Sequence, residues 1–399
     1  VIFAPGAGAT GFEALGEIIN GSVNPSGKTV DTFVKDLTET PYYNNMGLNA
    51  YTNVEDLKEQ IAANDPAYEG SMGFVNYAEG IYVGYKFYET AAEEGLIKYE
   101  DMVQYPFGYG LSYTTFDKQI ENFKDNGDTV TFDVTVENTG SVAGKDVVEI
   151  YYTAPYTNGG IEKAAANLIA FEKTDSIEPG ESQTKSFTIN KEDMASYDSE
   201  GIKISGGGYI LEAGEYTISL RSDSHTVLGE EKFTVDEDID YSKDGRSSDK
   251  TVATNQFEDY ARGDFEQLSR EDGFANYDKA CGVPEEDAYV MSDETRAAVE
   301  ENVFGIYDGT KYNNDSDEMP TTGAKNGMTL ADMRGLSYDD EKWDTLLDQL
   351  TVSDMDTMIA LGGYQTSAAS SVGKVMTVDC DGPASINNNF TGTGSIGFP

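Results

Sequence analysis

An aromatic and glycine-rich run, residues 104–116, constrains the fold of this chain more than any other segment. It reads QYPFGYGLSYTTF, so five of its thirteen residues are aromatic and two are glycines. Glycine permits tight backbone turns and proline fixes φ just before them, while the rings supply buried area that a loop otherwise lacks. The run therefore predicts an ordered connection held by packed rings, and neither a regular helix nor a plain strand.

The segment that follows, residues 118–236, predicts an antiparallel β-sandwich. Apolar and polar residues alternate along 130–137, and the same alternation returns at 148–152, 187–189 and 216–220. A period of two is typical of strands with one buried face, and glycine-containing turns separate these runs. We expect seven or eight strands.

The residues before the sandwich, 1–117, predict part of a mixed α/β domain. Residues 1–4 and 29–33 have the composition of short strands, and residues 12–19 carry one apolar helical face. The aromatic run closes this domain and leads into the sandwich.

After the sandwich, residues 237–335 are acidic and weakly periodic, which predicts a solvated linker that packs on neighbouring domains. The aspartates at positions 236, 238 and 240 lack the glycine and glutamate that a calcium loop needs at its sixth and twelfth positions. Neither the spacing of these aspartates nor any other pattern predicts a metal site.

Residues 336–399 predict a return to regular structure. Apolar residues at 343–350 follow a helical repeat, and residues 353–359 predict a second helix with Ser353 and Asp356 as a capping box. Residues 374–378 then predict a buried strand. With only about sixty residues, this part is too short for a complete (β/α)8 barrel, which needs roughly 250.

Charge and residue usage exclude several classes of function. With 27 basic and 72 acidic residues the net charge is −45, which opposes binding to nucleic acid or to an anionic lipid surface. The only histidine is His225, in a strand-end context typical of a structural role. A serine or cysteine triad is therefore disfavoured, because it needs a histidine base. Any acid–base chemistry would have to use carboxylates. The two cysteines, Cys281 and Cys380, show no disulfide or zinc spacing.

Two glycine patterns imitate nucleotide sites. Residues 6–11 fit G-x-G-x-x-G and are followed by Asp31, but a single βα unit follows, so a dinucleotide-binding fold is disfavoured. Residues 21–29 imitate a phosphate loop with five residues between the glycines where four are required. We expect no cofactor.

Several motifs taken in order resemble glycoside hydrolase family 3. They are a proline-glycine-led helix, an NPSGKT turn, an EGIYVGY segment, the aromatic run and an NTGSVAG turn, at residues 5–21, 24–29, 79–85, 105–116 and 138–144. The resemblance implies the C-terminal part of an α/β sandwich, followed by a fibronectin type III-like domain.

One candidate site residue follows from the same resemblance. Asp381 opens an Asp-Gly-Pro-Ala sequence after the strand expected at 374–378, and it resembles the family's aspartate that binds sugar hydroxyls near the start of the catalytic barrel. A carboxylate suits that role because it accepts two hydrogen bonds from neighbouring hydroxyls; the alternative is an ordinary turn. Asn387 stands where the family has an arginine, which leaves the second sugar contact in doubt.

The order of these motifs resembles the permuted members of the family, in which the barrel follows the fibronectin-like domain, and it implies that residues 336–399 are the start of the catalytic (β/α)8 barrel. The resemblance implies a retaining, exo-acting β-glucosidase with β-glucosides or oligosaccharides as substrates. A β-xylosidase, or a non-catalytic carbohydrate-binding or surface module, is the alternative. The nucleophilic aspartate is expected beyond Pro399 and the acid/base glutamate before Val1, so no catalytic residue is assigned and this chain is expected to be inactive by itself. For a bacterial enzyme of this kind, an extracellular or cell-surface location is favoured over the cytoplasm, and the sequence leaves the oligomeric state open.

Overall fold

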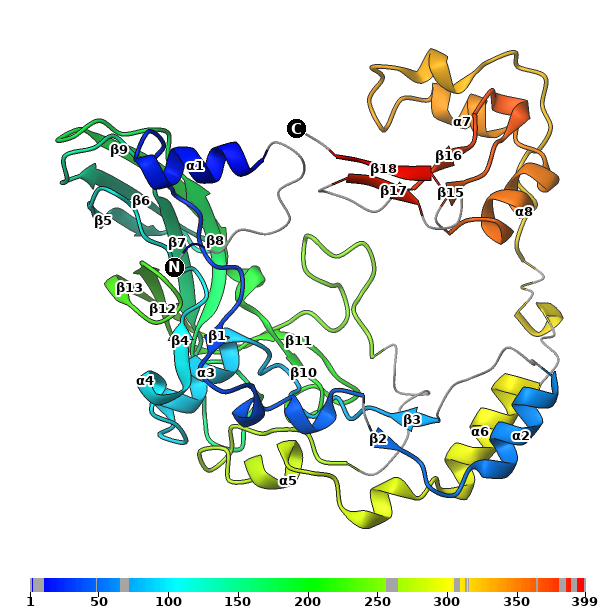
Figure 1. Ribbon diagram of the computed structural model, residues 1–399, viewed down its shortest axis with the longest axis horizontal. Helices are drawn as coiled ribbons and strands as arrows, with labels where there is room; N and C mark the ends of the chain where they lie inside the picture. Colours follow the sequence, from blue (N-terminus) through cyan, green and yellow to red (C-terminus); the bar gives the residue numbers. More distant parts are fainter. Residues whose placement is uncertain are drawn as a thin grey trace. The chain divides into compact units, whose positions relative to one another are not determined.

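A computed structural model describes most of the chain as two compact units. The described residues are 2, 11–47, 49–64, 72–255, 265–304, 309–312, 314, 316–363, 365–379, 385–388 and 393–397. The larger unit is Asn24–Gly305, and the smaller consists of Val1–Val23 with Ile306–Pro399 (Figure 1).

Seven strands form a sandwich in the larger unit, within the range that the alternation predicts. One antiparallel sheet has the order β5-β6-β9, built from Phe116–Asp125, Thr129–Asn138 and Ser182–Asn190. The other has the order β13-β12-β7-β8, built from Val227–Val235, Gly214–Arg221, Val147–Thr153 and Asn167–Lys173.

The alternating apolar side chains of both sheets meet in one core. Phe132 of β6 lies opposite Phe187 of β9 in the strand register, and their rings stack at 5.4 Å. From the other sheet, Ile218 and Leu220 of β12 are fully buried in the same cluster. The period-two pattern thus places one face of each sheet in the core, and at about 25 cal/mol per Å² this burial is the main stabilising term.

A third, smaller sheet lies beside the sandwich and includes a strand from the segment expected to be a linker. Its order is β10-β11-β14, from Ser196–Asp198, Gly208–Leu211 and Ile239–Asp240. Because β14 pairs with β11, the chain continues beside the sandwich as far as residue 240, past the boundary predicted at residue 236.

The α/β part of the larger unit is made of short elements. They are β1 (Phe33–Val34), β2 (Asn49–Ala50), α2 (Glu55–Asn64), β3 (Gly73–Phe74), α3 (Tyr85–Glu93), α4 (Tyr99–Met102) and β4 (Val103–Tyr105), with 3-10 turns at Leu37–Glu39 and Tyr43–Asn45. The strand predicted at 29–33 is wrong in extent, since only Phe33 enters one. Helix α3 buries Phe87, Tyr88 and Ala91 in a second core.

Residues 265–304 pack against the α/β part, as the linker prediction expected, but they are not solvated throughout. Leu268, Phe274 and Cys281 are buried in the core of α3, so apolar burial holds this segment against the α/β part. It contains α5 (Tyr277–Cys281), a 3-10 turn at Glu286–Tyr289 and α6 (Asp293–Phe304). Helix α6 lies beside α2, where Arg296 pairs with Asp56 (Figure 1).

The smaller unit has a modest core. Met333, Leu346, Ala369 and Val372 are its buried apolar residues. Its elements are α1 (Phe12–Asn20), β15 (Gln365–Thr366), β16 (Thr377–Val378), β17 (Ser385–Asn388), β18 (Thr393–Gly397), α7 (Lys342–Leu347), α8 (Val352–Ala360) and 3-10 turns at Gly309–Tyr312, Leu330–Met333 and Ser370–Val372.

Both helices predicted for this region and the helix at 12–19 are confirmed, but two details are wrong. The capping box of α8 is Thr351 with Asp354, two residues earlier than predicted, because the helix already begins at Val352. The predicted strand at 374–378 is reduced to two exposed residues that pair antiparallel with β15. The described residues therefore show no parallel strand of a barrel, and the barrel start stays a prediction; the strand predicted at 1–4 lies outside the described residues.

Candidate functional site

Three of the glycine-rich motifs meet at one place in the larger unit. The Asn24 side chain connects them: its Oδ1 accepts hydrogen bonds from Ser112 Oγ at 2.9 Å and from the Tyr113 amide at 2.8 Å. Its Nδ2 donates to the Ala143 carbonyl at 3.1 Å. One amide thus joins the NPSGKT turn to the aromatic run and to the NTGSVAG turn. We call this meeting point of residues 24–29, 104–116 and 138–144 the joint.

The hydrogen bonds of Thr29 hold the aromatic run in place and also account for the absence of a strand at most of residues 29–33. Its amide donates to the Tyr109 carbonyl and its carbonyl accepts from the Gly108 amide, each at 2.8 Å. Its Oγ1 donates to the Pro106 carbonyl at 2.5 Å. These bonds use the groups that a sheet ladder would need. Gly110 is required there, since a Cβ on it would lie 2.3 Å from the Gly27 carbonyl oxygen.

Asn138 satisfies the turn on the other side of the joint. The residue is fully buried, and its Oδ1 accepts from Thr114 Oγ1 at 2.6 Å and from the Gly140 amide at 3.1 Å. Its Nδ2 donates to the carbonyls of Val142 and Ile177, each at 2.8 Å. All hydrogen-bonding capacity of this amide is therefore used inside the protein.

We expect Asn138→Ala to lower the free energy of unfolding by about 2–4 kcal/mol, because it leaves several buried polar groups without partners. Urea denaturation followed by circular dichroism measures the change. The matched control is Asn190→Ala on the exposed side of β9, where we expect a change of about 0.5 kcal/mol or less. Equal losses in both variants would contradict a special role for Asn138.

A buried group of charges lies beneath the joint. Asp146 is held by Lys28 at 3.0 Å and by Lys118 at 2.9 Å. Burial opposes ionisation of this carboxyl, but the two lysines hold its pKa below the ordinary value. Nearby Glu149 is buried too, and its Oε2 accepts from Tyr151 Oη at 2.9 Å while no protein group bonds to Oε1. Burial raises the pKa of the Glu149 carboxyl to about 7.

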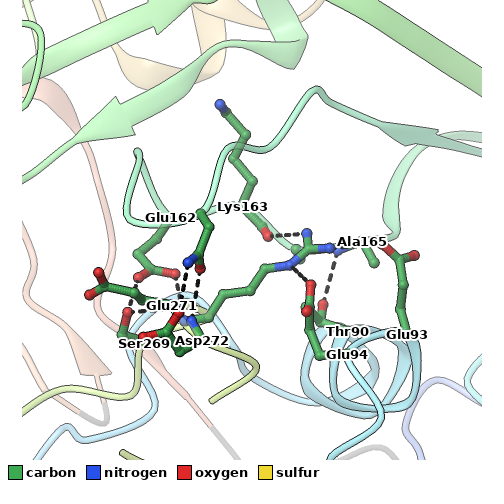
Figure 2. Close-up of polar contacts among 12 residues, drawn as sticks. Thr90, Glu93, Glu94, Glu162, Lys163, Ala165, Ser269, Glu271 and Asp272 are labelled. Carbon is green, nitrogen blue, oxygen red and sulfur yellow. Dashed lines mark hydrogen bonds and ion pairs between the residues drawn. The ribbon is translucent and has the colours of Figure 1, made fainter. Parts of the chain in front are cut away.

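A second polar cluster, around Arg270, fastens the segment after the sandwich (Figure 2). Arg270 Nε donates to Glu94 at 2.6 Å and Nη2 to Glu93 at 2.7 Å, both at the end of α3. Nη1 donates to the Lys163 carbonyl at 3.0 Å, and the guanidinium lies 4.3 Å from the Tyr156 ring centroid. We call this arrangement the Arg270 clamp.

Glu162 completes the clamp from the loop before β8. Its carboxylate accepts from the Arg270 amide at 3.0 Å and from the Ser269 hydroxyl (Figure 2). It also accepts from the Tyr82 hydroxyl. The Glu162 carboxylate, on a loop of the sandwich, therefore links Tyr82 of the α/β part to Ser269 and Arg270 of the later segment. All of these contacts are structural.

His225 has the structural environment that its sequence context predicted. Its Nδ1 lies 2.9 Å from Glu89 Oε2, and its ring stacks on Tyr99 at 3.6 Å. Ser224 Oγ donates to the other oxygen of the same Glu89 carboxylate at 2.9 Å. Because this serine donates to the carboxylate and not to the imidazole, the three residues do not form a nucleophile–base pair. The hydrogen bond to Glu89 raises the pKa of the histidine.

Asp381, the one candidate site residue predicted from the sequence, lies outside the described residues. The structure therefore does not place it against any partner. Most residues of the G-x-G-x-x-G pattern at 6–11 lie outside the described residues too.

Two of the aspartates considered for calcium have protein partners: Asp238 pairs with Lys203, and Asp240 accepts a hydrogen bond from the Ser242 amide. Within the described ranges there is no cluster of three or more histidine, cysteine or acidic side chains suited to a metal ion, and no helix long and apolar enough to cross a membrane.

Comparison with known proteins identifies the sandwich and the region around it. Residues 146–224 match the family model of the fibronectin type III-like domain. A β-glucosidase of Ruminococcus albus is 36% identical over 59% of this chain and 21% of its own length. β-Glucosidase A of Butyrivibrio fibrisolvens is 37% identical over 55% of this chain and 25% of its own. The resemblance to family 3 β-glucosidases is confirmed.

The curated relatives do not favour a β-xylosidase or a non-catalytic module. The chain spans about a fifth to a quarter of the length of these two relatives. Among solved structures, a β-glucosidase from Paenibacillus barengoltzii is 24% identical, covers 94% of this chain and 37% of its own, and superimposes with a TM-score of 0.55. At that identity the likeness concerns the fold alone.

Proposed function

We propose that this chain is part of a retaining, exo-acting β-glucosidase that releases terminal β-D-glucosyl residues. The similarity to β-glucosidases over 59% of the chain carries the proposal. Retaining glycosidases use a nucleophilic carboxylate and an acid/base carboxylate about 5–5.5 Å apart. We assign neither role to a residue of this chain.

The described residues contribute scaffold and not chemistry in this proposal. The joint holds the α/β part to the fibronectin-like sandwich, and the Arg270 clamp holds the segment that leads onward to Asp381. We propose that Asp381 contacts hydroxyls of the terminal glucose. The order of the segments, with Asp381 after the sandwich, is that of a permuted family 3 enzyme.

The test is an assay of the parent protein that contains this chain. We expect it to hydrolyse p-nitrophenyl β-D-glucoside with a larger kcat/KM than the corresponding β-xyloside. Proton NMR of the first product formed should show the β-anomer of glucose. An α-anomer as first product would rule out retention, and the absence of β-glucoside hydrolysis would rule out the function.

We expect Asp381→Ala in the parent enzyme to weaken inhibition by glucose by about 1.5–3 kcal/mol, because a charge-assisted hydrogen bond to the sugar is lost. Inhibition constants and the thermal midpoint are measured on the same variant. The control is Asp339→Ala, an exposed carboxylate of the same segment. A lower thermal midpoint with unchanged glucose inhibition would instead mark Asp381 as a turn residue.

We expect the purified 399-residue chain to hydrolyse no aryl β-glucoside above the background rate. The carboxylates that the structure describes near the joint and the clamp are bonded to protein groups: Asp146 to lysines, Glu149 to Tyr151 through one oxygen, Glu89 to Ser224 and His225, and the half-buried Glu162 to Tyr82 and Ser269. A chromogenic assay at high protein concentration checks this. Sustained turnover that survives repurification would contradict it.

A further inference from the structure

A pocket opens between helix α3 and the outer face of the four-stranded sheet, and neither the joint nor the proposed hydrolysis uses it. Its volume is about 480 Å³, within the roughly 300–1,000 Å³ typical of small-molecule sites. Side chains of α3, β7, β12, β13 and the β12–β13 turn line it. Because Ile218 and Leu220 of β12 point into the core, Thr217 and Arg221 lie on the opposite face, toward the pocket.

Two buried charged side chains are among the residues that line the pocket. Arg221 and Glu89 are 8% and 7% exposed. Arg221 Nε donates to Ser219 Oγ at 2.9 Å and Nη1 to the Ser224 carbonyl at 2.6 Å, and the guanidinium lies 5.3 Å from the Tyr151 ring centroid. A guanidinium has five N–H groups, so these two bonds orient it and leave donors for a ligand.

His225 forms a rigid wall of the same pocket. Glu89 binds its Nδ1 and Tyr99 stacks on its ring, while the side chain is still 46% exposed. With Nδ1 engaged by the carboxylate, Nε2 is the nitrogen left to contact a ligand. Because the Tyr99 ring and the Glu89 carboxylate already hold the imidazole in place, it loses little conformational freedom when a ligand binds.

Acceptors also line the pocket. Glu230 can accept, Thr217 adds a hydroxyl that can donate or accept, and Thr153 Oγ1, which donates to the Ala165 carbonyl at 2.6 Å, can still accept. Glu93 also lines the pocket but pairs with Arg270, and Glu89 binds His225. This leaves one charge of each sign, Arg221 and Glu230, while the whole chain carries −45. This excess of negative charge opposes a phosphate or carboxylate ligand. Mixed donors and acceptors without net positive charge suit a neutral polyhydroxylated molecule.

We propose that this pocket binds a neutral sugar, one or two units of a β-linked glucose chain. The choice of sugar among polyhydroxylated compounds rests on the proposed function. The pocket is formed entirely by residues of the larger unit, so the chain binds sugar here whether or not it performs hydrolysis.

Isothermal titration of the 399-residue chain with cellobiose tests the proposal. We expect saturable binding with one site, and a roughly fivefold weaker Kd in each variant: Thr217→Val loses one hydrogen bond, and Glu230→Gln replaces a charge-assisted hydrogen bond with a weaker neutral one. Valine has nearly the shape of threonine, and Glu230 is exposed, so both variants should keep the thermal midpoint. Thr188→Val, on the exposed side of β9, is the matched control and should bind like the unaltered chain.

Each outcome decides the proposal. Absence of saturable cellobiose binding, or equal affinity in Thr217→Val, Glu230→Gln and the control, would overturn it. Sodium phosphate binding more tightly than cellobiose would replace it with an anion site. Because turnover is measured on the parent enzyme, failure here leaves the β-glucosidase proposal standing. A parent that is inactive on β-glucosides, with cellobiose binding intact, would reject only the proposed hydrolysis.

Discussion

Replacing Arg270 with methionine should lower the free energy of unfolding of the larger unit by about 2–3 kcal/mol. The Arg270 side chain is 6% exposed and its guanidinium holds Glu93, Glu94 and the Lys163 carbonyl together. Methionine fills similar volume but leaves carboxylates and a carbonyl without their donor in a partly buried place. The Glu93 and Glu94 side chains left behind are 55% and 25% exposed, so solvent screens part of their charge and the cost stays below that of breaking a fully buried ion pair.

The measurement is urea denaturation of the chain, followed by far-ultraviolet circular dichroism. The matched control is Lys232→Met, which breaks an ion pair to Glu215 whose partners are both more than half exposed. That variant should lose about 1 kcal/mol or less, since solvent screens the pair. Similar losses in the two variants would show that the Arg270 clamp does not hold residues 265–281 in place.

Limited proteolysis gives an independent result for the same change. If the clamp fastens the segment, Arg270→Met should increase cleavage within 265–281 before the sandwich is attacked. Uniform cleavage across the larger unit would instead indicate global destabilisation without a local effect.

The period-two alternation predicted the sandwich because its cause is local: one face of each strand is buried and the next residue is not. Val134 and Val136 are both fully buried, as that pattern requires. The helices at 12–19, 343–350 and 353–359 were predicted for a similar reason. By contrast, Thr29 lies in a stretch with the composition of a strand, yet its hydrogen-bonding groups are bonded to residues some eighty positions away in the sequence.

The clamp and the joint could be predicted only in part. The aromatic run and its glycines were recognisable, but the contact between Gly110 and Gly27 depends on a close approach of two loops. Arg270 is the only basic residue of 265–278, and the apolar side chains of Leu268 and Phe274 beside it were a signal that this acidic stretch packs against something. Its partners Glu93 and Glu94 carry no such signal, because exposed and clamped glutamates look alike in sequence.

The pKa of Glu149 predicts how stability changes with pH. The carboxyl is 3% exposed, and burial raises its pKa from an ordinary value near 4.5 to about 7. Between these two pH values the folded chain holds a proton that the unfolded chain has released. The contribution of Glu149 is therefore fully present below about pH 4.5 and is lost as pH rises through about 7, by about 3 kcal/mol in all.

We expect Glu149→Gln to remove this dependence. The amide stays neutral at every pH, and its carbonyl can still accept from Tyr151, whose hydroxyl donates to Glu149 in the native chain. The variant should gain stability relative to the native chain as pH rises from 5 to 8, by up to about 3 kcal/mol. Urea denaturation at several pH values measures both proteins.

The difference between the two curves isolates Glu149, because other titrating groups are shared and cancel. His225 is one of these: its raised pKa also makes a contribution that is lost as pH rises, and it is present in both proteins. Gly108 packs so closely that a Cβ there would lie 2.2 Å from Glu149 Oε2, which leaves no room for water on that side. Parallel curves from pH 5 to 8 would mean that Glu149 titrates near its ordinary pKa, and that solvent reaches the carboxyl beneath the joint.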